Sequence, residues 1–366
     1  MMSPRALNRA LLARQMLLAR ATVPVVGAIE RLVGLQAQVP RPPFIGLWTR
    51  LDRFRRGDLA DALRSRAAVR ATTMRATIHI MSAADYVALR PALQPALSRG
   101  MESALRDRTA GLDLPTLDRV ARAFFGKRAA TFDALRTHLR AGGDGDERAM
   151  AYAIRTHVPL VQVPTDDPWA FPAAADFTLA DAWLACAIST EPSPADALVR
   201  RYLAAFGPAT AADARAWSGL QGLGDVFERL RPSLVTFRDE RKRELFDLPD
   251  SPRPSEDEAA PIRLIPEFDN LVLAHDDRTR VIADEHRPRV TLKNLQVRAT
   301  FLVDGFVAGA WRVTRTKKAA TLVLEPFGRL TKKTLAALEQ EGEDLLQFVE
   351  PEAATRDVRV DKAAAG

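Results

Sequence analysis

A β-hairpin is predicted by the stretch Val69-Arg70-Ala71-Thr72-Thr73, Met74-Arg75, Ala76-Thr77-Ile78-His79-Ile80-Met81. Apolar and β-branched residues fill both arms, and Met74-Arg75 separates them as a tight turn. Apolar residues recur at helical spacing before the hairpin, in the segments 4–20, 25–33, 44–54 and 58–63. Helices followed by a β-hairpin are the layout of a winged-helix unit, in which the hairpin, or wing, lies beside nucleic acid.

The same layout recurs further along the chain. Phe125-Gly126 followed by Thr131 resembles Phe206-Gly207 followed by Thr210. In both places the glycine is expected to end a helix and the threonine to cap the next one. Strand-like segments follow, at 160–163 and 169–171 after the first copy and at 234–237 and 244–247 after the second. The sequence thus predicts three winged-helix-like units, with two unrelated helical domains as the alternative.

A β-rich section follows the polar loop Asp250–Ala260. It has a strong hairpin turn at Asp304-Gly305, and its strands and closing helix are predicted at 262–265, 271–273, 298–303, 306–313, 320–326 and 332–348. A second hairpin ends in the basic tip Thr314-Arg315-Thr316-Lys317-Lys318. Such a tip is either a solvated turn or a contact for phosphates. The predicted class is α+β, with winged-helix units at 1–110, 111–190 and 191–255 and the β-rich section at 256–366.

The segment Gly34-Leu35-Gln36-Ala37-Gln38-Val39-Pro40 lies where the helix at 25–33 should stop, because Pro40 disfavours helical geometry at Val39. Gln36 is expected in the last helical turn and Gln38 in the exit, where their side chains can converge. Each neutral amide has two donors and an acceptor oxygen that need partners. Solvation or capping of the helix end is the alternative role for the pair.

Composition describes a globular protein, and its charge favours polyanionic partners, with a GC-rich genome as the alternative origin of the many arginines. Of 366 residues, 47% are hydrophobic and 27% charged, and 53 Lys and Arg against 46 Asp and Glu give a net charge of +7. The pI of about 9.9 favours nucleic acid as a partner. The single Cys186 lies in an apolar run, so it is expected to be a buried thiol without a disulfide. No membrane span is predicted, and the expected location is the cytoplasm, in association with the nucleoid.

Other catalytic signatures are weak. The glycine-rich segment Gly219–Gly224 follows a helix and is interpreted as a turn, not as a phosphate-binding loop. The five histidines do not have the spacing of metal ligands, and His275-Asp276-Asp277 is expected to be a solvated turn. We therefore expect no metal and no cofactor. Glu267 and Asp269 are a candidate acid pair on one side of an extended segment, with ordering of the loops as the alternative.

Several of these segments together resemble the AlkZ-type family of bacterial DNA glycosylases. They are Gln36-Ala37-Gln38, Met74–His79, Tyr202-Leu203 with Phe206–Thr210, Trp217–Leu220, Leu264–Asn270, Leu302–Gly305 and Gly309–Arg312. The resemblance implies three tandem winged-helix units and a β-rich section in a C-shape around duplex DNA. It also implies a glutamine–hydrophobic–glutamine catalytic motif at Gln36 and Gln38. Ala37 is a small residue for the middle of that motif, and Ala76 stands where the family commonly has glycine.

The implied function is a monofunctional DNA glycosylase that excises N7-alkylated purines, extending to interstrand crosslinks and self-resistance to an alkylating natural product. Gln36 and Gln38 would place the water that attacks C1′. The alternatives are a DNA-binding regulator without catalysis and an architectural or catalytically silent protein. Double-stranded DNA is the expected partner of a monomer, and the candidate DNA-binding residues are Arg75, Thr77, His79, Arg312, Arg315, Lys317 and Lys318. Strand alternation places Arg75, Thr77 and His79 on one face; a structural histidine is the alternative for His79.

Overall fold

The structure is a computed structural model that describes residues 1–143, 145–293 and 295–361. Its α-helices are α1 Pro4–Arg14, α2 Val25–Arg31, α3 Pro42–Trp48, α4 Arg56–Arg64, α5 Ala83–Leu105, α6 Leu114–Phe125, α7 Phe132–Ala141, α8 Glu147–His157, α9 Ala180–Leu184, α10 Asp196–Phe206, α11 Ala211–Ser218, α12 Leu223–Leu230, α13 Arg287–Val290 and α14 Lys332–Val349. Short 3-10 helices are η1 Met74–Ala76, η2 Arg106–Thr109, η3 Arg231–Ser233, η4 Asn270–Val272 and η5 Asp284–His286.

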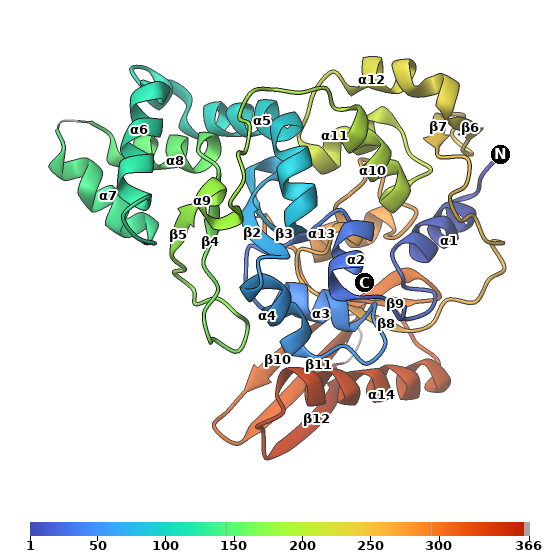
Figure 1. Ribbon diagram of the computed structural model, residues 1–366. Coiled ribbons are helices and arrows are strands. Elements are labelled where there is room, and N and C mark those ends of the chain that lie inside the picture. Colours follow the sequence, from blue (N-terminus) through green and yellow to red (C-terminus); the bar gives the residue numbers. More distant parts are fainter. Residues whose placement is uncertain (144, 294, 362–366) are drawn as a thin grey trace.

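The strands form two five-stranded sheets and one separate hairpin. They are β1 Leu35–Gln36, β2 Ala68–Thr72, β3 Ile78–Ser82, β4 Leu160–Gln162, β5 Phe177–Leu179, β6 Val235–Arg238, β7 Glu244–Asp247, β8 Arg263–Ile265, β9 Thr300–Val303, β10 Phe306–Arg315, β11 Ala319–Pro326 and β12 Thr355–Val360. Figure 1 shows most helices in the N-terminal two thirds and the long strands of the second sheet in the C-terminal third. The expected mixture of helices and strands, α+β, is confirmed.

The predicted β2–β3 hairpin is present, but it is not a projecting wing. It lies in the middle of the first sheet, whose order is β1-β3-β2-β4-β5, and Ala71 of β2 pairs with both His79 of β3 and Val161 of β4. Every residue of β2 and β3 is buried. Because both arms carry apolar residues on both faces, the hairpin packs inside the protein. One sheet therefore joins the first two predicted units.

The third predicted unit has its own hairpin. Strands β6 and β7 pair antiparallel and are not joined to the other sheets. The threonine caps are confirmed in both copies of the repeat. The side chain of Thr131 accepts a hydrogen bond from the amide of Ala134 at 3.2 Å, and Thr210 forms a capping box with Asp213 at the start of α11.

The segment 169–171 is not a strand, as was predicted, but part of a loop between β4 and β5. Its Trp169 packs its ring against Phe44 of α3 and Phe348 of α14, with ring centroids 5.3 and 6.4 Å apart. The aromatic residues of this loop give it the apolar content of a strand. Phe171 is buried and Trp169 is half-buried. The loop thereby joins the N-terminal helices to the closing helix.

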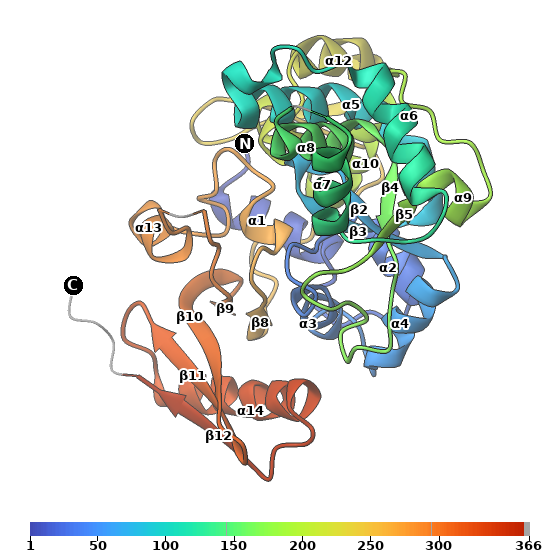
Figure 2. The same ribbon diagram turned by 90° about the vertical axis from the view of Figure 1, so that its left-hand side faces the viewer.

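The second sheet has the order β12-β11-β10-β9-β8, antiparallel except for the parallel pair β11–β12. Figure 2 shows strands β10–β12, with α14, below the helical part. The turn at Asp304-Gly305 and the loop Asp250–Ala260 are confirmed. The segment 271–273 is not a strand, because η4 begins at Asn270 under a cap from Asp269. Strand β12 was missed by the sequence analysis.

Two further expectations are corrected. Helix α1 ends at Arg14, not at residue 20, and Met16 then adopts a left-handed conformation with φ of 56°. Cys186 is exposed, not buried. It follows α9, where Ala185 takes a left-handed turn with φ of 54° and ends the helix. Among the described residues, no helix is long and apolar enough to cross a membrane.

Helix α1 is buried although it is rich in arginine. The guanidinium of Arg14 donates to both carboxylate oxygens of Asp247 on β7, at 2.7 Å each, and also to the carbonyl of Leu203 at 2.8 Å. The side chains of Arg14 and Asp247 are at most 1% exposed. The first helix is thus held against the third unit by a buried ion pair.

Asp247→Ala should lower the free energy of unfolding by about 3–5 kcal/mol, because it leaves the Arg14 charge buried without its partner. Chemical denaturation measures the loss. Asp133→Ala is the matched control, since Asp133 pairs with Arg136 at a side-chain exposure of 78% and such a pair contributes about 1 kcal/mol or less. Equal losses in the two variants would contradict a structural role for the buried pair.

Candidate active site

Gln36 lies on a strand and not in the last turn of a helix, which corrects the expectation. Helix α2 ends at Arg31, and Val33 and Gly34 then take φ angles of 51° and 92°. At Gly34 a Cβ atom would lie 3.1 Å from the carbonyl oxygen of Ile80, so glycine suits both the conformation and the space. The chain reverses there into β1, and Gln36 pairs with His79 of β3.

The two glutamine amides are each held by their oxygen. Gln36 Oε1 accepts a hydrogen bond from Nη2 of Arg75 at 2.7 Å, and Gln38 Oε1 accepts one from the backbone amide of Ile78 at 3.1 Å. Arginine and a backbone amide can only donate, so neither amide can be turned around without placing two donors face to face. Gln36 is buried and Gln38 is exposed. One glutamine of the pair therefore lies in the interior of the protein and the other lies at its surface.

A small pocket lies beside Gln36. We call it the glutamine pocket, and it encloses about 300 Å³, part of which is open to solvent. Its interior has room for about one water molecule. The polar side chains that line it come from four segments of the chain and are those of Gln15, Gln36, Arg50, Glu267, Asp269 and Asn270.

Arg75 joins three segments at this pocket. Besides Gln36, its Nη2 donates to Oδ1 of Asn270 at 3.2 Å, and its Nη1 donates to the carbonyl oxygen of Trp217 at the end of α11. Burial, with a smaller contribution from the charge of Arg278, lowers the pKa of Arg75 to about 10. Arg75 is therefore still a cation at neutral pH, and it fixes the position of the Gln36 amide.

The expected face of Arg75, Thr77 and His79 is not formed, because Arg75 does not lie on a strand. It belongs to η1, where Arg75 and Ala76 have φ angles of 54° and 55°, and β3 begins only at Ile78. Left-handed residues interrupt the alternation on which the expectation depended. Thr77 is half-buried and its hydroxyl donates to the carbonyl of Met74 at 3.0 Å.

His79 is completely buried. Its Nδ1 lies 3.1 Å from the carbonyl of Thr77, so Nδ1 carries the proton, and Nε2 has no partner among the described residues. Burial, and then the charge of Arg75, lowers its pKa to about 3. A side chain without exposed surface cannot contact DNA in this conformation, so the burial favours the structural role for His79.

Glu267 and Asp269, the candidate acid pair, have different surroundings in the structure. Asp269 is buried, and both its oxygens accept hydrogen bonds from Arg50 at 2.8 Å. Phe268, with φ of 59°, turns the chain between the two carboxylates, so they do not share one side of an extended segment. Glu267 is half-buried at the glutamine pocket. Asp269 thus orders the loop, while Glu267 faces the pocket.

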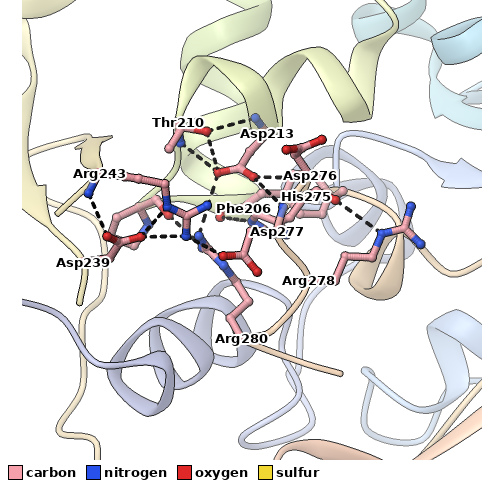
Figure 3. A network of polar contacts seen from close by, with 12 residues as sticks. Phe206, Thr210, Asp213, Asp239, Arg243, His275, Asp276, Asp277, Arg278 and Arg280 are labelled. Atoms are coloured by element: carbon pink, nitrogen blue, oxygen red, sulfur yellow. Dashed lines mark hydrogen bonds and ion pairs between the residues drawn. The ribbon is translucent and has the colours of Figure 1, made fainter. Parts of the chain in front are cut away.

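A second polar network fixes the far end of the segment that carries Glu267 and Asn270 (Figure 3). Asp213 of α11 accepts hydrogen bonds from the backbone amide of Asp276 at 2.9 Å and from Thr210 at 2.9 Å. Nε2 of His275 donates to the carbonyl of Phe206 at 3.0 Å. His275 is buried, so the expectation of a solvated turn is wrong at this residue. Arg280 donates to the carbonyl of Pro208 at 2.7 Å.

The basic candidates lie in the second sheet. Arg312 pairs with Glu325, and Arg315 with Glu350 at 3.3 Å. Lys317 and Lys318 are exposed at the tip between β10 and β11, and no ion pair to them is found within the described ranges. Their contacts with DNA stay a prediction.

The sequence did not indicate the roles of four residues near the glutamines. Arg50 binds Asp269, Asn270 receives Arg75, and Arg70 donates to the carbonyl of Ala37 at 2.7 and 3.0 Å. A fourth is Arg41, which pairs with Glu350 at 3.3 Å. Only Arg41 could have been found from the sequence, by its place directly after Pro40. The other contacts join residues far apart in the chain.

Comparison with known proteins places these features in a family. Residues 29–348 match the family model described as "DNA glycosylase AlkZ-like". The chain therefore belongs to the AlkZ-like DNA glycosylase family, and its substrate is DNA. DNA glycosylases are hydrolases that cleave the N-glycosidic bond between a base and its sugar.

The fold is also similar to that of a solved structure over nearly the whole length. That structure is the DNA glycosylase AlkZ of Streptomyces sahachiroi, with a TM-score of 0.80 and 21% sequence identity over 98% of this chain and 100% of that chain. No curated protein matches the sequence significantly. At this identity the likeness shows a shared fold.

His79→Ala should lower the free energy of unfolding by about 2–3 kcal/mol, because it leaves a cavity in the first sheet. Base excision per folded molecule should stay within about twofold of the wild type, since the imidazole is shielded from the pocket's surface. Denaturation and single-turnover excision measure the two effects. A large loss of excision at unchanged stability would contradict the structural role.

Stability should fall as the pH is lowered from about 6.5 towards 3. Burial lowers the pKa of both His79 and His275 to about 3, whereas the pKa in the unfolded chain is about 6.5. In this window the unfolded state binds more protons, so each histidine destabilises the fold by up to about 1.4 kcal/mol per pH unit. Urea midpoints at several pH values measure the slope. His275→Gln should reduce it; an unchanged slope would contradict the assignment.

Proposed function

We propose that this protein is a monofunctional DNA glycosylase that excises N7-alkylated purines from duplex DNA. The observation that carries the proposal is the Gln36 amide, held by Arg75 at the wall of a pocket with room for about one water molecule. Gln36 and Gln38 are the proposed catalytic pair. Their amides would position the water that attacks C1′ of the sugar.

The proposed reaction needs neither a strong acid nor a strong base from the protein. A purine alkylated at N7 is a cation and a good leaving group, so it needs no strong acid to protonate it. The enzyme has to orient a water molecule and stabilise the positive charge that grows on the sugar, which fixed dipoles can do. Neutral glutamines cannot act as strong bases. Normal bases would be spared because their glycosidic bonds are too strong.

The proposed architecture for DNA binding is three winged-helix-like units, 1–110, 111–190 and 191–255, with the β-rich section 256–366, in a C-shape around the duplex. In its support, helices precede each of the hairpins β2–β3, β4–β5 and β6–β7. The shared first sheet means that the first two units would move as one body. Arg75, Thr77 and Arg312 are proposed contacts near the lesion.

Excision of 7-methylguanine from methylated DNA is the direct test. Wild-type protein should release the free base, and Gln36→Ala and Gln38→Ala should each lose excision by about 10- to 1000-fold, the scale for removing one fixed hydrogen-bonding group. Both variants should still bind the duplex, because the amides are assigned to the water and not to affinity. Wild-type rates in both would contradict the glutamine assignment. No release by the wild type would favour a regulator without catalysis.

The basic tip is proposed to hold the DNA backbone, with most effect on long or crosslinked substrates. Replacing Arg315, Lys317 and Lys318 by alanine should flatten the slope of log affinity against log salt by about 2–3 units, since each phosphate contact contributes about 0.9. Fluorescence anisotropy at several salt concentrations measures the slope. Lys127→Ala with Arg128→Ala is the control, because both residues are exposed at the end of α6. An unchanged slope in the triple variant would place the tip away from DNA.

Unhooking of interstrand crosslinks is the wider part of the proposal, together with self-resistance to an alkylating natural product. A denaturing gel separates the crosslinked from the unhooked duplex. The tip variant should lose more activity on this substrate than on 7-methylguanine.

A further inference from the structure

The glutamine pair lacks a strong acceptor for the water's proton. The oxygen of Gln36 accepts from Arg75 at 2.7 Å and that of Gln38 accepts from Ile78 at 3.1 Å. Arg75 is a cation, and it draws electron density from the amide oxygen to which it donates. The Nε2 groups of both glutamines can only donate. An attacking water needs an acceptor that takes its proton as the bond to C1′ forms, and neither amide is suited to this.

A carboxylate lies at the same pocket. Glu267 lines the glutamine pocket with Gln36 and Asn270, and Asp269 is the other acid there. The carboxylate of Asp269 is already neutralised, because Arg50 donates hydrogen bonds to both of its oxygens. No hydrogen bond or ion pair to the Glu267 carboxylate is found in the part of the chain that the structure describes. Glu267 is thus the acid of the pocket with acceptor capacity to spare.

Glu267 also lines a second, larger space, which we call the outer hollow. It encloses about 890 Å³, part of it open to solvent. Its other walls include Val39, Phe268, Trp311 and Arg312. Pro42 and Glu267 line both spaces. Glu267 therefore lies at the boundary between a space with room for about one water molecule and a space large enough to admit part of a nucleotide.

A cation lies at the same wall as Glu267. Arg41 lines the outer hollow, and its pKa is lowered by burial, against the carboxylates of Glu350 and Glu267, which raise it. Nε and Nη2 of Arg41 are buried without a partner among the described residues. A cation at this wall offsets the repulsion between Glu267 and the phosphates of a bound strand.

We propose that Glu267 is a further catalytic residue of the reaction, which rests on the glycosylase function proposed above. A water molecule in the glutamine pocket, held by the Gln36 amide, donates a hydrogen bond to the Glu267 carboxylate. The water oxygen forms a bond to C1′ as the bond from C1′ to the purine nitrogen breaks. The bonding electrons leave with the cationic N7-alkylated base, which becomes neutral, and the water's proton passes to Glu267 and then to solvent. The negative carboxylate also stabilises positive charge on the sugar.

Glu267→Gln tests the proposal with the least change in shape. Single-turnover excision of 7-methylguanine from a duplex should fall by about 100-fold, the scale of general-base catalysis, while affinity for undamaged duplex stays within about twofold. Glu191→Gln, at an exposed loop position, is the control for the change in net charge.

Glu267→Ala with added formate is the second arm. Formate should restore part of the lost rate in Glu267→Ala, where it can occupy the vacated space, but not in Glu267→Gln. A structural role for Glu267 would predict no rescue and a lowered melting temperature. Excision by Glu267→Gln at the wild-type rate would overturn the proposal and leave the glycosylase function standing. Absence of base release by the wild-type protein would overturn both.

Discussion

The candidate active site depends on the hydrogen bonds that the guanidinium of Arg75 donates. It brings together Gln36 from the first sheet, Asn270 from the segment between β8 and β9 of the second sheet, and the carbonyl of Trp217 from α11. Burying a cation is costly unless acceptors surround it, and here the acceptors come from three distant parts of the chain. The Arg75 cation therefore orients the Gln36 amide. Because it is stable in the interior only with all three acceptors, it also holds their segments together.

The fold supplies that rigidity by sharing elements between its parts. The first sheet takes strands from segments far apart in the sequence, and α1 is fastened to β7 by the pair of Arg14 and Asp247. The largest apolar cluster includes residues from α1, α5, α10 and the segment 271–282. A displacement of any one unit would disturb the packing of the others. This suits a site whose polar groups must keep their positions within a fraction of an ångström.

The chemistry of the site follows from what is already paired. Asp269 and Arg50 neutralise each other, His79 is neutral and enclosed, and each glutamine oxygen already accepts a hydrogen bond. Besides the Arg50–Asp269 pair, the polar residues that line the pocket are Gln15, Gln36, Asn270 and Glu267. Such a set can place water and favour a developing positive charge, but it has no strong acid for the leaving base. It is matched to bases that are activated by alkylation.

The sequence by itself determined the local structure. Threonine caps, the Asp304-Gly305 turn and the β2–β3 hairpin follow from short-range chemistry, and so they were predictable. The motif of Gln36 and Gln38, with the segments around it, was sufficient to indicate the family. Tertiary structure decided the surroundings of those residues. Contacts between distant segments bury His79 and bring Arg75 to Gln36, to which it donates a hydrogen bond. Left-handed residues such as Arg75 and Phe268 also matter, and Phe268 separates Glu267 from Asp269. Periodicity cannot reveal these, because it describes neighbours along the chain and not neighbours in space.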